Sequence, residues 1–127
     1  MFSGFLKRQI DRQKNWQKGR QKTGYDKKLL FFIPLYFLAF DAYLLRFSKG
    51  SYIPKHVDTV DRYHHYRLNI VINSSFKGGE FVCEKAYLNT KRIKFFKSDS
   101  MPHSVCQVEE GTRLVLSIGL AVRRIFS

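Results

Sequence analysis

One long apolar run constrains the fold of this chain more than any other feature. The seventeen residues from Leu29 to Leu45 contain a single charged residue, Asp41, in a chain whose formal net charge is +13. A helix needs about 20 apolar residues to cross a bilayer, with roughly 17 as the lower limit. As a helix, this run would be apolar around its whole circumference, whereas a helix on a soluble core carries a polar face. The sequence therefore predicts a transmembrane helix over residues 29–46.

Individual residues of the run bear on this interpretation. Pro34 is acceptable, because neighbouring groups in a membrane helix can satisfy the carbonyl that a proline frees. Tyr36 and Tyr43 suit a membrane interface or a contact between helices. Asp41 is costly inside a bilayer, and two interpretations stay open: an acid that reaches headgroup water, or one that pairs with a cation on a neighbouring helix. The alternative to a span is a helix buried in a soluble core.

The charges on either side of the run predict an orientation. Residues 1–28 carry nine Lys or Arg against two Asp, and they form a basic, partly amphipathic arm suited to an anionic inner leaflet. Seven Lys or Arg lie in the twenty residues before the run, against four in the twenty from Arg46 onward. The more basic side stays cytosolic. We therefore expect a signal anchor in the inner (cytoplasmic) membrane, single-pass, with a cytosolic N-terminus and a periplasmic C-terminal domain.

The C-terminal half alternates in the manner of strands. Residues 47–63 are expected as a linker and residues 64–127 as a small antiparallel all-β domain of about five strands, a barrel or a sandwich. The clearest strand covers residues 113–124, where five aliphatic residues recur at every second position. That spacing predicts one dedicated core face, formed by Leu114, Leu116, Ile118, Leu120 and Val122. The expected fold class is a membrane-anchored α+β protein.

Two cysteines, Cys83 and Cys106, allow one disulfide between neighbouring strands. A bridge closing an interval of this length stabilises a small domain by about 3 kcal/mol and persists only in an oxidising compartment. Two buried free thiols fit the sequence equally well, because cysteine is often simply a small core residue.

No residue set predicts catalysis. The histidines are His56, His64, His65 and His103, and their spacing matches no familiar set of metal ligands. Adjacent histidines on a strand point to opposite faces and cannot chelate one ion together. We find no nucleophile motif and no phosphate-binding glycine loop. The sequence therefore predicts no metal, no cofactor and no enzyme.

One basic stripe interleaves cations with aromatic residues and is predicted to bind a partner. It comprises Lys91, Arg92, Lys94, Phe96 and Lys97. A strand is expected over residues 92–97, basic on its outer face, with Ile93 and Phe95 on its inner face. Together these features predict a non-enzymatic membrane subunit that scaffolds or tethers an envelope complex of the secretion, conjugation or division type, as an oligomer or with other envelope proteins. The alternative is a basic ribosome-associated or nucleic-acid-binding protein in which bases stack on the stripe.

Overall fold

The computed structural model describes residues 15–18, 24–59 and 62–124, and every regular element in these ranges is a β-strand. The strands are β1 (Gln17–Lys18), β2 (Asp26–Pro34), β3 (Leu38–Phe47), β4 (Ile53–His56), β5 (Tyr63–Val71), β6 (Phe76–Gly78), β7 (Phe81–Val82), β8 (Leu88–Asn89), β9 (Ile93–Lys97), β10 (His103–Val105), β11 (Val108–Gly111) and β12 (Arg113–Arg123). The basic arm expected over residues 1–28 lies mostly outside the described residues.

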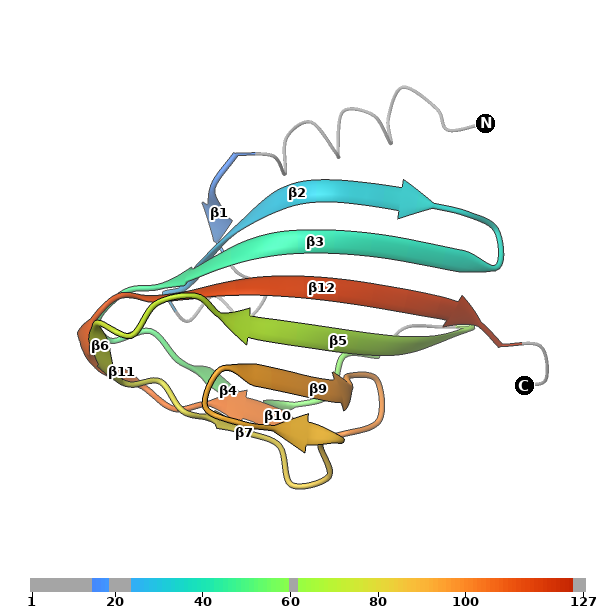
Figure 1. Ribbon diagram of the computed structural model, residues 1–127. Coiled ribbons are helices and arrows are strands. Elements are labelled where there is room, and N and C mark those ends of the chain that lie inside the picture. Colours follow the sequence, from blue (N-terminus) through green and yellow to red (C-terminus); the bar gives the residue numbers. More distant parts are fainter. Residues whose placement is uncertain (1–14, 19–23, 60–61, 125–127) are drawn as a thin grey trace.

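The strands form two facing layers (Figure 1). The larger sheet has the order β1-β2-β3-β12-β5-β9-β8, and the smaller has the order β4-β10-β7, while β11 and β6 form a separate pair. All of these pairings are antiparallel. The buried core lies between the layers, since its residues come from both sheets: Tyr25, Phe47, Val71, Phe81, Cys83, Phe96, Val105, Val108 and Val115.

The apolar run is a β-hairpin and not a helix. Strands β2 and β3 pair along their whole length, and the amide of Leu35 donates to the carbonyl of Leu38 at 2.9 Å across the turn. The run contains four Phe and two Tyr, residues that favour strands. Its apolar residues are divided between two faces: Leu29 is buried, whereas Leu30, Phe31 and Ile33 are 44%, 44% and 45% exposed. No helix among the described residues is long and apolar enough to cross a membrane.

The predicted transmembrane helix is therefore wrong. The expectations that depended on it are wrong as well: the membrane-anchored α+β class, the signal anchor, the single-pass inner-membrane topology and the lipid bilayer as a partner. The centre of the expected span is the tip of the hairpin, where Leu35, Tyr36 and Phe37 are 55%, 67% and 64% exposed.

Strand β12 lies in the middle of the larger sheet and corresponds to the strand predicted over residues 113–124. It pairs with β3 on one side and β5 on the other. Its orientation is the reverse of the predicted one. Arg113, Val115 and Ser117 are buried between the sheets, while the five aliphatic residues face the outside of the larger sheet and are half-buried.

Strand β9 is reversed in the same sense. Lys94 and Phe96 are 7% and 2% exposed, whereas Ile93 and Phe95, which were expected inside, are 40% and 36% exposed. In both strands the face toward the interior carries a cation. The interior of this protein therefore contains polar groups, which is the arrangement expected of a binding site rather than of a purely structural core.

Candidate metal centre

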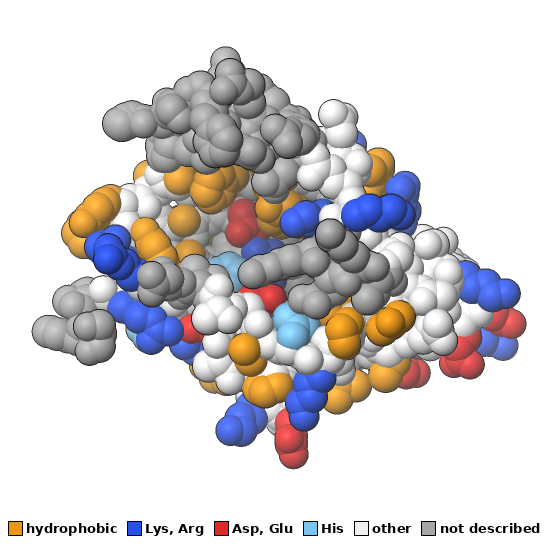
Figure 2. Space-filling model, turned by 180° about the vertical axis from the view of Figure 1, so that it is seen from behind, with side chains coloured by type: hydrophobic (Ala, Val, Ile, Leu, Met, Phe, Trp, Pro, Cys, Tyr) orange, Lys and Arg blue, Asp and Glu red, His pale blue; other side chains and the backbone are white. Residues whose placement is uncertain are grey.

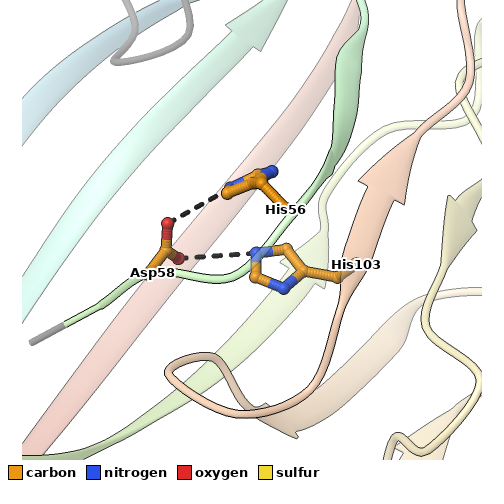
Figure 3. Close-up of side chains that lie close together, drawn as sticks. All are labelled: His56, Asp58 and His103. Atoms are coloured by element: carbon orange, nitrogen blue, oxygen red, sulfur yellow. Dashed lines mark ion pairs between the residues drawn. The ribbon is translucent and has the colours of Figure 1, made fainter.

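Three potential metal ligands converge between the two sheets (Figure 3). His56 ends β4 and His103 begins β10, and these two residues are paired in the antiparallel register of the smaller sheet. Asp58 follows His56 by two residues and lies between the imidazoles. Its Oδ1 is 3.2 Å from His56 Nε2, and its Oδ2 is 3.4 Å from His103 Nε2. One ligand atom from each residue lies within 4.8 Å of the other two.

Both imidazoles are held in the same way. His56 Nδ1 donates to the carbonyl of Pro54 at 2.7 Å, and His103 Nδ1 donates to the carbonyl of Met101 at 2.8 Å. A ring nitrogen that faces a carbonyl oxygen must carry the proton, so the neutral ring keeps its lone pair on Nε2. In each histidine this is the nitrogen that faces Asp58. Metal-bound histidines are oriented by hydrogen bonds of this kind.

Packing and a backbone hydrogen bond fix the three side chains. The rings of His56 and His103 have centroids 4.5 Å apart, and His103 also packs on Phe96 at 4.7 Å. The amide of Asp58 donates to the carbonyl of Ser98 at 2.8 Å, which fixes the start of the segment after β4. Two imidazoles and one carboxylate on one side of an ion leave its remaining positions open, the arrangement typical of non-haem iron oxygenases.

His56, Asp58 and His103, called the triad below, line a cavity of about 250 Å³, and Arg113 lines the same cavity. Figure 2 shows histidine, acidic and basic side chains gathered in a hollow at the centre of one face of the molecule. Arg113 is 3% exposed, and its guanidinium lies 5.1 Å from the centre of the Phe47 ring. Burial lowers the pKa of Arg113 to about 10, so the group stays charged at neutral pH. The ion pairs between described residues do not include it.

A second charged group in the cavity is already paired. Arg67 donates to Asp41 Oδ1 at 2.5 Å and to Ser117 Oγ at 2.8 Å. Gly119 is paired with Asp41 on β3 and with Arg67 on β5 in the register of the sheet. A Cβ at position 119 would be 2.2 Å from Arg67 Nη2. His65 lines the cavity nearby, and burial together with the Arg67 charge lowers its pKa below the ordinary value. This part of the wall is therefore rigid and close to neutral overall.

A family model described as "2OG-Fe(II) oxygenase superfamily" matches residues 42–118, a range that contains the triad and Arg113. The chain belongs to the 2OG-Fe(II) oxygenase superfamily. Its two facing sheets are the double-stranded β-helix, or cupin-like, fold of this superfamily. No curated protein matches the sequence.

Several solved structures share this fold, and two of them are prolyl hydroxylases. A prolyl-4-hydroxylase from Pseudomonas putida is 15% identical with a TM-score of 0.66, and the match covers 94% of this chain and 83% of that one. The viral collagen prolyl hydroxylase of Paramecium bursaria Chlorella virus-1 is 14% identical with a TM-score of 0.60, covering 83% of each chain. KdgF from Halomonas sp. is 20% identical with a TM-score of 0.57, covering 87% of this chain and 88% of that one.

Membership of an enzyme superfamily overturns the functional predictions from sequence. The chain is not the expected non-enzymatic membrane scaffold, and the alternative of a ribosome-associated or nucleic-acid-binding protein is wrong as well. The expected envelope partners were inferred from the same membrane architecture and are wrong with it.

The structure distributes the predicted site residues over different surroundings. Of the residues expected in the span, Leu29 is buried, Pro34 ends β2 and Tyr36 is exposed at the hairpin tip. Asp41, Tyr43 and Leu45 line the cavity that holds the triad.

The predicted disulfide and stripe residues are also separated in their surroundings. Cys83 is a buried free thiol and Cys106 an exposed one. In the stripe, Lys91 and Arg92 are exposed, Lys94 and Phe96 are buried, and Lys97 pairs with Asp99 at 2.9 Å.

The sequence analysis did not bring His56, Asp58 and His103 together, because only two of them are close in sequence. The available clue was the pair His56 and Asp58, two residues apart in an extended segment, where both side chains point to one side. His103 is far away in sequence, and only the pairing of β4 with β10 brings it close. Arg113 was counted as an ordinary outward residue of a strand whose faces were assigned the wrong way round.

Proposed function

We propose that this chain is an iron- and 2-oxoglutarate-dependent oxygenase. In this proposal His56, Asp58 and His103 hold Fe(II), and Arg113 binds the remote carboxylate of 2-oxoglutarate. The observation that carries the proposal is the convergence of two imidazoles, each with its proton held away on a backbone carbonyl, on one carboxylate. When bound, the iron and the oxo acid supply the chemistry that activates dioxygen to oxidise a substrate while the oxo acid loses carbon dioxide.

The residues of the chain fit both ligands. Asp58 offers a negative charge and the imidazoles offer neutral nitrogens, the ligand types that suit Fe(II) with open positions for the oxo acid and dioxygen. Arg113 supplies planar, bidentate N–H donors that match a carboxylate. Its burial beside Phe47 excludes water, so an anion there is bound in a low-dielectric environment where charge-assisted hydrogen bonds are strong.

The size of the cavity bears on the substrate. At about 250 Å³ it lies below the range of about 300 to 1,000 Å³ that is usual for pockets enclosing larger organic ligands. A small acid bound between Arg113 and the triad would occupy much of it. We therefore propose that the reacting group of the substrate approaches from outside the cavity.

Ligand binding by purified variants tests the proposal. Titration with Mn(II), a redox-inert stand-in for Fe(II), should show one site that His103→Ala weakens more than 100-fold, since even loss of a residue supporting a ligand typically costs 10–100-fold. Arg113→Met should leave metal affinity intact and weaken 2-oxoglutarate binding by about 10- to 150-fold. His64→Ala, a histidine outside the cavity lining, is the matched control and should change neither affinity.

Formation of succinate from 2-oxoglutarate under air gives the activity readout. It should depend on added iron and be lost in His103→Ala. Wild-type protein that binds neither Mn(II) nor 2-oxoglutarate, or His64→Ala that weakens binding as much as His103→Ala, would refute the assignment.

A further inference from the structure

A second cavity, of about 470 Å³, is also lined by Arg113. Its walls include the turn between β6 and β7 and the turn between β8 and β9. Phe81 and Arg113 line both cavities, whereas His56, Asp58 and His103 line only the first. Arg113 is therefore a shared wall. A Cβ on Gly79, which lines the second cavity, would lie 2.9 Å from Arg113 Cδ and 3.7 Å from its Nε, so the Nε edge of the guanidinium borders that cavity.

Lys94 is the distinctive residue of the second cavity. It is 7% exposed, because the reversed alternation of β9 turns its side chain inward. Its ammonium donates to Asn89 Oδ1 at 2.9 Å and to the carbonyl of Thr90. Both acceptors are neutral, so neither balances the charge. Burial lowers the pKa of Lys94, and the nearby charge of Arg113 lowers it further.

Two buried cations thus share one cavity, and no acid in the described part of the chain pairs with either of them. The ion pairs between described residues include neither Lys94 nor Arg113. Asp26, Asp41 and Asp99 are committed to other cations. Glu80 is the one acid among the lining residues, and it is exposed and outside ion-pair distance of both. Buried charges are ordinarily paired, because an uncompensated one is expensive in a low-dielectric interior.

We propose that the second cavity binds a small oxyanion with two negative charges, of the inorganic phosphate or sulfate class, between Lys94 and Arg113. An ammonium and a guanidinium supply N–H donors that match the oxygens of such an ion. Two negative charges would neutralise both cations. Lys91 and Arg92, exposed at the rim, add positive charge that raises the local concentration of anions.

Because Arg113 lines both cavities, an anion bound in the second cavity should affect ligand binding in the first. An anion that draws the Arg113 guanidinium toward Lys94 competes with the carboxylate of 2-oxoglutarate for the same donors. Phosphate would then weaken 2-oxoglutarate binding without touching the metal ligands. This competition rests on the proposed function, whereas the anion site itself does not.

Phosphate titration of the full-length, metal-free protein tests the site, with chloride at equal ionic strength as the reference. We expect saturable binding that Lys94→Met weakens at least tenfold, since a lost charge-assisted hydrogen bond has an effect of that order. Methionine is a near-isosteric apolar replacement, and thermal unfolding shows whether that variant is folded. Lys94→Arg, which restores the charge, should recover part of the affinity.

Lys77→Met is the matched control, because it removes the same charge from an exposed side chain that pairs with Glu110 outside the cavity. It should leave phosphate affinity within twofold. Equal weakening in Lys77→Met and Lys94→Met would mean that phosphate responds only to net charge, and undiminished binding in folded Lys94→Met would exclude Lys94; either result overturns the proposal.

A second titration separates the two proposals. Phosphate should raise the apparent Kd of 2-oxoglutarate in wild-type protein but much less in Lys94→Met. If phosphate binds through Lys94 while 2-oxoglutarate does not bind at all, the proposed oxygenase function fails and the anion site stands. If 2-oxoglutarate binds and phosphate does not, the reverse holds.

Discussion

The two faces of β12 differ in a way that the rest of the molecule explains. The outward face carries Leu114, Leu116, Ile118, Leu120 and Val122, all half-buried, whereas the inward face carries Arg113, Val115, Ser117 and Gly119, all buried. The more apolar face is thus the less buried one. In a protein whose interior is a binding site, the inward face must supply charge, hydroxyl groups and space. Part of the apolar surface that is buried on folding then lies on the outer face of the sheet.

The largest effect should come from filling space on the inward face. A Cβ at position 119 would lie 2.2 Å from Arg67 Nη2 and 2.7 Å from Asp41 Oδ1, so Gly119→Val must displace the ion pair. We expect a loss of about 3–5 kcal/mol in the free energy of unfolding, the usual cost of breaking a buried pair. Ile118→Val, one position away on the outward face, should cost only about 1 kcal/mol. Equal costs in urea unfolding would contradict the contrast between the faces.

Truncations on the two faces should differ by less. Val115 is 1% exposed, so Val115→Ala leaves a cavity in the core and should cost about 2–3 kcal/mol. Leu116 is half-buried, and although Leu116→Ala removes more atoms, it should cost only about 1–2 kcal/mol because solvent already reaches the site. Chemical denaturation measures both. A Leu116→Ala variant that is the less stable of the two would show that the outward face is the principal core.

The inward face should also give stability a pH dependence. Burial and the Arg67 charge lower the pKa of His65 in the folded protein. The unfolded chain therefore takes up this proton first, and the contribution is fully present above the unfolded pKa of about 6.5 and is lost as the pH falls through it. His65→Gln should flatten the decrease in unfolding free energy between pH 7 and 5 by up to about 1.4 kcal/mol per pH unit. An unchanged slope would mean that His65 is not protected from protonation.

The smallest effect should come from the hairpin tip, which belongs to neither face. Leu35→Lys introduces a charge into the middle of the longest apolar run, yet Leu35 is 55% exposed in a turn. We expect the unfolding free energy to change by less than about 0.5 kcal/mol, as is usual for surface positions. A loss of several kcal/mol in thermal or chemical unfolding would mean that another surface covers this tip.

Local patterns predicted local structure and failed where distant segments meet. The period of two in residues 113–124 identified β12, because side-chain alternation is a property of the strand itself. Which face is buried depends on the partner sheet, and β12 and β9 were both assigned the wrong way round. The run from Leu29 to Leu45 was misread because average apolarity does not distinguish a helix from a β-hairpin that carries apolar side chains on both faces.

The candidate site was less predictable than the fold. His56 and His103 meet through the pairing of β4 with β10, a contact between segments far apart in the chain, and no periodicity reports such a contact. Arg113 and Lys94 looked like surface cations because charged residues are rarely buried. Their burial becomes intelligible only once the cavities between the sheets are known.

His56 and His103 share one local hydrogen bond, in which the Nδ1 of the imidazole donates to the carbonyl two residues earlier in the same segment. The tautomer of each ring is therefore set within its own stretch of three residues, while packing between the two rings and on Phe96 holds their positions. With β4 and β10 paired, the Nε2 of each ring faces Asp58. Two such three-residue segments, placed on another pair of adjacent antiparallel strands, would present two Nε2 atoms of defined tautomer to a metal ion.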